Sequence, residues 1–334
     1  MEADPSVYVM GLGVPDPTGI FGTTAGLEAK FGPRRVLDMP LAENAMTGIA
    51  IGTALVGMRP VMTHQRVDFA LLAMEQIVNQ AAKWHYMFDG KHRVPLVIRM
   101  IIGRGWGQGP QHSQSLQAMF AQVPGLKVIM PTTANDAKGL LISAIEDDNP
   151  VVSLEHRWLY GIADEVSVNM YRTPIGRARI MREGTDFTIV GLSYMSLEAL
   201  RAAELLAERG VSAEVIDLRS LRPLDEETVL GSVSKTGRLL AADTAHRLFG
   251  ASSEIVALVS EKAFGALKSA PVRVTLPDHP TPTSCALAND YYPRAGHIAA
   301  AVLRQLGHPV DDSLYLPPEG RSLDQPDPLF TGPF

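Results

Sequence analysis

Glu43 is the first residue in the sequence whose surroundings suit chemistry. It stands immediately before a predicted helix, in a stretch (residues 41–57) that has no other charged side chain and is rich in glycine and alanine. Such small residues let a helix approach another backbone or a cofactor closely. Desolvation in this apolar setting favours a neutral carboxyl, which can share a proton with the ring nitrogen of a heterocycle. The alternative is that Glu43 only complements the dipole of the helix.

His112 is the second candidate, because it lies in a glycine-rich loop, residues 103–114, that follows a predicted buried strand. Open α/β sheets bind ligands in loops at the carboxyl ends of their strands. The same loop carries Gln111, Ser113 and Gln114, so an imidazole among them could transfer a proton or anchor a substrate. A histidine that only hydrogen-bonds the loop backbone remains an open alternative.

The elements that carry these residues alternate between strands and helices. Nearly all-apolar runs such as residues 94–102 are typical of parallel strands covered on both faces. Helical spacing of apolar residues predicts a long helix over 69–88, with Asp68 as its cap, and another over 135–146. These elements form a βαβ series with strands that we predict over 6–10, 35–39, 59–66, 126–130 and 150–155.

A second unit follows a stretch with scattered charges and no sustained period. It begins with a predicted strand over 187–191 and a helix over 196–209, and continues with strands over 215–218, 238–243 and 272–276. We therefore predict an α/β protein with two open, mainly parallel-sheet domains. The predicted boundaries are a first domain over 1–165, a linker over 166–185, a second domain over 186–306 and an extended, proline-rich tail over 307–334.

Composition narrows the class of partner. A net charge of −6 without a dense block of lysine and arginine argues against nucleic acid or an anionic membrane, and favours a small molecule or another protein. Apolar runs end well before the roughly 18 residues of a membrane span, and the N-terminus lacks the basic and apolar regions of a signal peptide. We therefore expect a cytoplasmic protein. A lone cysteine, Cys285, excludes an internal disulfide.

Several motifs, in the same order along the chain, resemble the β subunit of thiamine-diphosphate-dependent 2-oxoacid dehydrogenases. That family is related to transketolase and includes the pyruvate, branched-chain and acetoin enzymes. The resemblance spans about residues 5–305. The motifs that carry it lie at residues 41–52, 75–83, 111–114, 124–131, 147–151, 215–225 and 235–238.

The resemblance implies a pyrimidine-binding domain followed by a domain of the transketolase C-terminal type. Under it, Glu43 is the acid that hydrogen-bonds the aminopyrimidine ring of thiamine diphosphate, Phe69 packs near that ring, and His112 faces the substrate. A carboxyl at that ring promotes the tautomer that activates the thiazolium carbon. The resemblance also implies a structural potassium ion, for which a capped helix end is the alternative. Its ligands would be oxygens of Leu96, Ala144, Asp147 and Asn149.

A partner is implied as well. Thiamine enzymes hold the diphosphate through Mg²⁺ bound by a Gly-Asp-Gly motif with a downstream asparagine, and this chain has no matching stretch. The resemblance therefore implies that a separate α subunit holds the Mg²⁺ in an α₂β₂ heterotetramer. A lipoyl or other carrier protein would receive the product.

Some residues depart from the family pattern. The loop after the first strand has no acid before Asp16, where relatives usually carry acidic residues. Arg66, Arg104 and Trp106 place two guanidiniums and an indole near the expected substrate side. We predict Arg66, Trp106 and Gln111 as contacts for an anionic or polar substrate.

Three functions remain open on the sequence. The first is the β subunit of an oxidative 2-oxoacid decarboxylase that passes an acyl group to a lipoyl carrier. The second is one half of a split transketolase-like enzyme that moves a two-carbon ketol unit to an aldehyde or carrier protein. The third is a non-catalytic assembly subunit, and the presence of both Glu43 and His112 argues against it.

Overall fold

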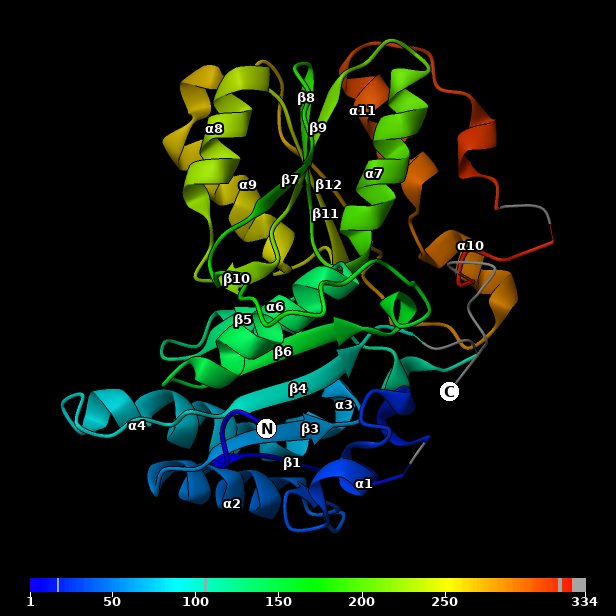
Figure 1. The fold of residues 1–334 in the computed structure, drawn as a ribbon. Coiled ribbons are helices and arrows are strands. Elements are labelled where there is room, and N and C mark those ends of the chain that lie inside the picture. Colours follow the sequence, from blue (N-terminus) through cyan, green and yellow to red (C-terminus); the bar gives the residue numbers. More distant parts are fainter. Residues whose placement is uncertain (17, 105–106, 318–319, 326–334) are drawn as a thin grey trace.

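The apolar runs of the sequence become the strands of two sheets. Our computed structural model describes residues 1–16, 18–104, 107–317 and 320–325. The sheets belong to two α/β domains stacked on each other, with the second domain above the first in Figure 1. The predicted fold class, with two open and mainly parallel sheets, is confirmed.

The first sheet has seven strands in the order β10-β5-β6-β4-β3-β1-β2, and only β10 runs antiparallel to its neighbour. Alternate residues face opposite sides, as in β1, where Val7 and Val9 join one core and Tyr8 and Met10 join the other. Both faces are therefore buried, as the apolar runs predict. The strands are β1 (Val7–Gly11), β2 (Val36–Leu37), β3 (Arg59–His64), β4 (Val97–Ile102), β5 (Lys127–Ile129), β6 (Val151–His156) and β10 (Ser220–Arg222).

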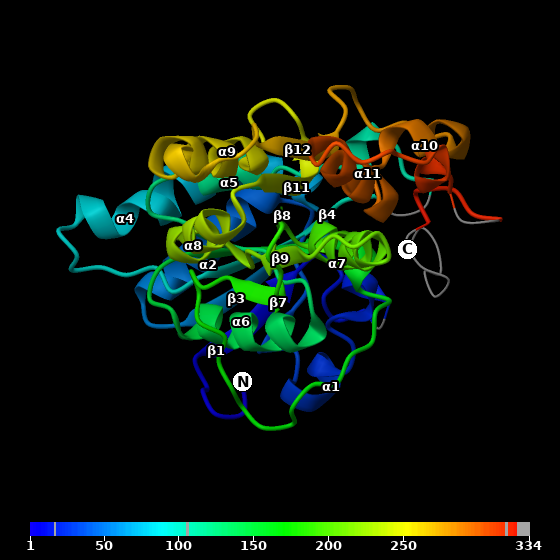
Figure 2. The ribbon, with the colours of Figure 1, turned by 90° about the horizontal axis from the view of Figure 1, so that it is seen from above.

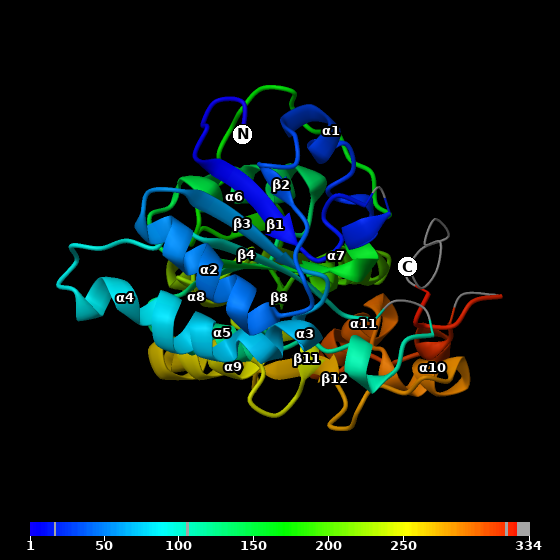
Figure 3. The ribbon, with the colours of Figure 1, turned by 90° about the horizontal axis from the view of Figure 1, so that it is seen from below.

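Helices cover both faces of the first sheet. On one face, α2 (Glu43–Leu55) lies beside the helical run from α3 (Val67–Ala70) to α4 (Ala82–Met87), as Figure 3 shows. The run that we predicted as one helix over 69–88 is broken by a 3₁₀ turn and by a π-helical segment, Glu75–Ala81. Such π segments are frequent at functional sites. The other helices of this domain are α1 (Leu27–Phe31), α5 (Gln117–Ala121) and α6 (Ala134–Glu146).

The second sheet has the order β12-β11-β8-β9-β7, with α7 and α11 on one face and α8 and α9 on the other (Figure 2). Asp225 caps α8 as predicted, because its carboxylate accepts a hydrogen bond from the backbone N–H of Thr228 at 3.1 Å. None of the helices in the described ranges has both the length and the apolar composition that crossing a membrane requires. The elements are β7 (Arg179–Arg182), β8 (Phe187–Gly191), β9 (Ala213–Asp217), β11 (Leu239–His246), β12 (Val272–Leu276), α7 (Tyr194–Ala207), α8 (Glu226–Thr236), α9 (Ala251–Lys262), α10 (Ala288–Tyr291) and α11 (Ala295–Gln305).

Three segments depart from the predicted organisation. The segment predicted as a linker contains β7, which pairs antiparallel with β9. The second half of the chain also supplies β10, which joins the first sheet beside β5. The tail is not simply extended over a surface, because Leu323 is 3% exposed and Asp324 is fully buried. All three depend on long-range contacts, which local patterns in the sequence do not encode.

Candidate active site

The predicted site residues follow strands that lie close together in the first sheet. β2 leads into Glu43, β3 leads into Arg66 and Phe69, and β4 leads into the loop that carries His112. Parallel strands end at the same edge of their sheet, and open α/β sheets bind ligands there. The topology therefore brings the three segments to one edge.

Glu43 is the first residue of α2 and is only 5% exposed. Its side chain does not cap the helix, and no residue in the described part of the chain hydrogen-bonds its carboxylate. The carboxylate oxygens are therefore free to accept a hydrogen bond from a donor group outside the chain. The acid also lies in the first turn of the helix, where it complements the helix dipole.

Phe69 and His112 come together although 43 positions separate them in the sequence. Their ring centroids are 5.4 Å apart, with an angle of 75° between the ring planes, so the imidazole packs edge-on. Such pairs add to the stability that burial gives and favour this relative orientation of the two rings. Gln111, next to His112, is exposed, and Trp106 lies outside the described residues.

Arg66 is buried beside the loop that carries His112. It is 3% exposed, donates a hydrogen bond to the backbone oxygen of Gly103, and pairs with Asp68 at 3.3 Å. Only its Nη1 atom lacks a hydrogen-bond partner among the described residues, and that atom is buried too. Burial lowers the pKa of the Arg66 guanidinium. The Arg66 guanidinium thus holds the start of the loop that carries His112. Its predicted contact with a substrate stays a prediction.

Asp68 completes this arrangement at the other end of the loop. Its carboxylate accepts a hydrogen bond from the side chain of Gln114 at 2.8 Å, and the backbone N–H of Gly103 donates to the oxygen of Gln114 at 3.0 Å. We predicted that Asp68 caps the following helix. This was wrong, because α3 begins at Val67 and its N-cap is Arg66. The base of the loop is thus closed by one network of side-chain and backbone hydrogen bonds.

Two buried histidines at the same edge were not identified from the sequence. His64 ends β3, with its Nε2 3.4 Å from Thr47 Oγ1 on α2, and burial lowers the pKa of His64 to about 4. His156 ends β6, and burial followed by the charge of Arg66 lowers its pKa to about 3. Both imidazoles are therefore neutral near pH 7. A side chain on Gly103, whose φ is +77°, would collide with the His156 ring, so the loop requires glycine there.

Two of the four predicted potassium ligands, Asp147 and Asn149, lie in the turn after α6. Asp147 lies at the centre of this turn: its Oδ1 accepts the backbone N–H of Asn149 at 2.9 Å, and its Oδ2 pairs with Lys127. Arg59 donates to the backbone oxygen of Asp147 at 3.0 Å. Two side-chain cations thus already contact oxygens of this turn. The remaining predicted ligands are the backbone oxygens of Leu96 and Ala144, which each accept a backbone N–H.

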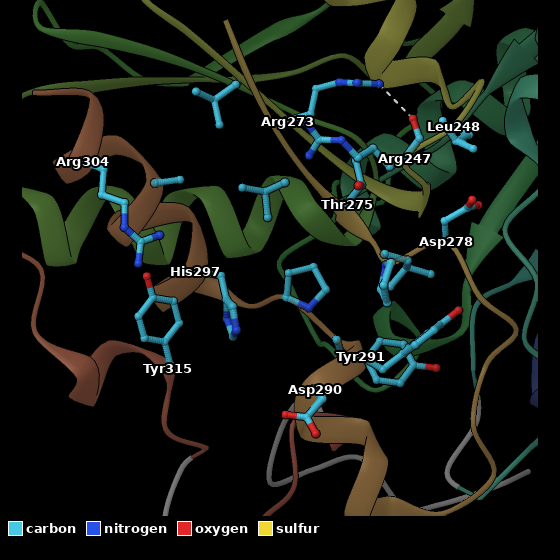
Figure 4. A pocket seen from close by; sticks show the side chains of 17 residues that line it. Arg247, Leu248, Arg273, Thr275, Asp278, Asp290, Tyr291, His297, Arg304 and Tyr315 are labelled. Carbon is cyan, nitrogen blue, oxygen red and sulfur yellow. Dashed lines mark hydrogen bonds between the residues drawn. The ribbon is translucent and has the colours of Figure 1, made fainter.

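A separate groove lies along β12, at the edge of the second sheet (Figure 4). Its volume is about 600 Å³, and arginines line both of its sides. One of them, Arg273, is held in place because it donates a hydrogen bond to the backbone oxygen of Arg247 at 2.8 Å. None of the predicted site residues lines this groove, so it is not part of the candidate active site.

In the described ranges, no group of three or more His, Cys, Asp or Glu side chains is placed to hold a metal ion.

Comparison with known proteins gives matches along nearly the whole chain. Residues 1–162 match the family model for the transketolase pyrimidine-binding domain, and residues 176–298 match the model for the transketolase C-terminal domain. The chain is 45% identical to the acetoin:2,6-dichlorophenolindophenol oxidoreductase subunit beta of Cupriavidus necator, over 92% of this chain and 93% of that protein. It is 44% identical to the mitochondrial pyruvate dehydrogenase E1 component subunit beta-1 of Arabidopsis thaliana, over 91% and 85% of the two chains.

A solved structure agrees with the fold. The inactive β4 tetramer of a split gene transketolase matches this chain with a TM-score of 0.75 and 27% sequence identity. The match covers 92% of this chain and 93% of that one.

Proposed function

Because the chain belongs to the family of β subunits of thiamine-diphosphate-dependent 2-oxoacid dehydrogenases, we propose that it decarboxylates a 2-oxoacid together with an α subunit and passes the acyl group to a lipoyl carrier. The observation that carries this proposal is Glu43, a residue only 5% exposed whose carboxylate no residue in the described ranges hydrogen-bonds. It is the group that a cofactor with a proton-sharing ring nitrogen requires.

The residues at the sheet edge suit thiamine diphosphate. In our proposal Glu43 hydrogen-bonds the aminopyrimidine ring and Phe69 packs near it. When bound, the cofactor supplies an electron sink for decarboxylation. The chain's own part is to place the Glu43 carboxyl, on a residue that is 5% exposed, where it can hydrogen-bond that ring.

His112 and Gln111 are proposed to contact the substrate. The imidazole is half-buried and held against the Phe69 ring, so its direction is fixed before a substrate arrives. Such an imidazole can hydrogen-bond the carboxylate of a 2-oxoacid or guide the acyl group onward. The neighbouring amide of Gln111 is exposed and adds a donor and an acceptor on the same short turn, Pro110–His112.

Exposed apolar side chains on α2 support an interface with another chain. Ile49 on α2 is 53% exposed, and Val56, the residue directly after the helix, is 81% exposed. Between them a side chain on Gly52 would meet no atom within 4 Å, so the surface there is open. A helix that starts at the candidate cofactor residue and exposes apolar side chains suits a partner that completes the cofactor site. We propose that this partner is the α subunit, which would hold the Mg²⁺ and the diphosphate.

The isolated chain is expected to bind thiamine diphosphate poorly, because Glu43 and Phe69 contact only the pyrimidine end in this proposal. Adding the α subunit is expected to restore binding. Isothermal titration calorimetry, with and without Mg²⁺, measures this directly. Tight, Mg²⁺-dependent binding to the chain alone would contradict the division of the site between two subunits.

The reaction itself is tested with the reconstituted pair. Pyruvate and branched 2-oxoacids are expected to release carbon dioxide, and a lipoyl domain is expected to become acylated. Sequence identity of 45% to a dehydrogenase-type subunit, against 27% to the split transketolase, favours this reaction over ketol transfer. Turnover of ketose phosphates without carbon dioxide release would overturn the proposal.

The potassium site stays a prediction, and we expect the ion to add little stability. Lys127 and Arg59 already donate to oxygens of Asp147, so a bound cation would face two like charges. Replacing potassium chloride with choline chloride is therefore expected to change the melting temperature by less than about 1.5 °C, the effect of about 1 kcal/mol in a chain of 334 residues. A larger fall that sodium chloride does not prevent would show a specific potassium site.

A further inference from the structure

The C-terminal tail reaches back to the candidate active site. Leu323 is buried in an aromatic cluster with Trp158, Tyr194 and Tyr292. Its backbone is held on both sides: the N–H donates to the side chain of Asn289 at 2.8 Å, and the oxygen accepts from Arg294 Nη1 at 2.8 Å. Residues 321–325, which we call the strap, are therefore a docked part of the fold.

Asp324 of the strap forms an ion pair with Arg104, the second residue of the loop that carries His112. The Nη2 and Oδ2 atoms are 2.8 Å apart, and both side chains are fully buried. Removing one partner from such a pair leaves an uncompensated charge in a low-dielectric interior, which is strongly unfavourable. The loop and the strap therefore depend on each other.

Arg104 also ties the loop to the second half of the chain. Its guanidinium donates to the backbone oxygens of Pro282 at 2.5 Å and Thr283 at 3.0 Å, and it lies 5.8 Å from the ring centroid of Tyr292. The neighbouring residue Gly103 is held by Arg66. Consecutive residues at the start of the loop are thus anchored to opposite sides, one to the first domain and one to the strap region.

We propose that the strap positions the His112 loop through the Arg104–Asp324 ion pair, so that residues at the far C-terminus set the alignment of the active site. This inference rests on the proposed function of His112. Arg104 and Asp324 are positioning residues in this proposal, since neither is exposed to a substrate. From the sequence we expected Arg104 near the substrate, but its buried guanidinium pairs with Asp324 and donates to the backbone oxygens of Pro282 and Thr283.

The strap is tested by Asp324→Asn in the full-length chain, with hydrogen exchange followed by mass spectrometry. Backbone amides of residues 107–114 are expected to exchange about tenfold faster or more, because the loop loses its ion pair with the strap. Exchange in β4 and β6 is expected to stay unchanged. Asp312→Asn, the same substitution at an exposed site of the same tail, is the matched control and should leave all rates as they are.

A second variant covers the case in which Asp324→Asn fails to fold. In Arg104→Gln/Asp324→Asn neither partner carries a charge, so no unpaired charge is buried, and the loop is still expected to exchange faster. Exchange that is unchanged in residues 107–114, or that rises equally throughout the chain, would overturn the proposal.

Activity of the reconstituted complex separates positioning from general stability. We expect Asp324→Asn to lower kcat about tenfold or more while the KM for the lipoyl domain stays within about twofold, because the loop moves but the docking surface does not. Unchanged kcat despite faster exchange would show that the strap does not position His112. The exchange measurement does not require turnover, so it remains valid even if the proposed reaction is wrong.

Discussion

Replacing Glu43 with glutamine is expected to slow deuterium exchange at the thiazolium carbon of the reconstituted complex by on the order of 10² or more, the usual contribution of a positioned acid or base. Glutamine keeps the size of the side chain and can still hydrogen-bond, but it cannot share a proton with the pyrimidine. Cofactor affinity should fall only modestly, because most of the binding comes from the diphosphate end. The fold should be little affected, since no described residue hydrogen-bonds the carboxylate and a helix-dipole contact is worth about 0.3–1 kcal/mol.

The matched control is Glu227→Gln, which removes an exposed acid from the first turn of α8. It should leave the exchange rate unchanged and shift the melting temperature about as little as Glu43→Gln does. A large loss of stability in Glu43→Gln with unchanged thiazolium exchange would show that Glu43 is only a structural acid of α2. That outcome would remove the main support for the proposed function.

Replacing Glu155 with glutamine is expected to lower the free energy of unfolding by on the order of 3 kcal/mol or more. Glu155 on β6 accepts two hydrogen bonds from Arg99 on β4, both at 2.7 Å, and a third from the Tyr160 hydroxyl at 2.8 Å. The side chains of the pair are 10% and 13% exposed. An amide leaves the buried Arg99 charge without its counter-charge, and chemical unfolding of the full chain measures the cost.

Glu146→Gln is the matched control, because Arg172 also binds Glu146 through two hydrogen bonds but at the surface. Solvent screens that pair, so we expect a loss of less than about 1 kcal/mol. Equal losses in the two variants would contradict the view that burial makes the Arg99–Glu155 pair important.

The effect of Glu155 should also depend on pH. Burial alone would raise the pKa of Glu155, but the charge and hydrogen bonds of Arg99 hold it below its usual range. A carboxyl with a lowered pKa in the folded state stabilises the fold above its unfolded pKa, about 4.3, and the contribution is lost as the pH falls through the folded pKa. The gap in stability between the wild type and Glu155→Gln should therefore narrow below about pH 4.

The sequence predicted the fold well where the signal is local. Apolar runs became buried parallel strands, and Asp225 caps its helix as expected. The prediction of one helix over 69–88 was wrong in detail, because 3₁₀, π and α segments follow one another there and the spacing of apolar residues does not distinguish them. β7 and β10 were missed because each depends on a partner far away in the sequence.

In the candidate active site, too, local signals could be predicted and long-range contacts could not. Glu43 and His112 could be selected from residue type and neighbours alone, and the topology brings their segments to one edge of the sheet. The contacts of Arg66 and Arg104 could not be predicted from the sequence. Each arginine pairs with a carboxylate, Asp68 or Asp324, and local sequence patterns do not show these pairs. A buried arginine and a substrate-binding arginine look alike until their partners are known.

β10 has a consequence for how this protein could change through evolution. It comes from the second half of the chain, yet it forms the outer edge of the first sheet and pairs with β5. A gene fusion that exchanged the second domain for one from another lineage would also exchange this edge strand. The first sheet would then expose the N–H and C=O groups of β5, unless the replacement domain supplied a strand that pairs with β5. The two domains are thus expected to have been inherited together rather than shuffled as independent modules.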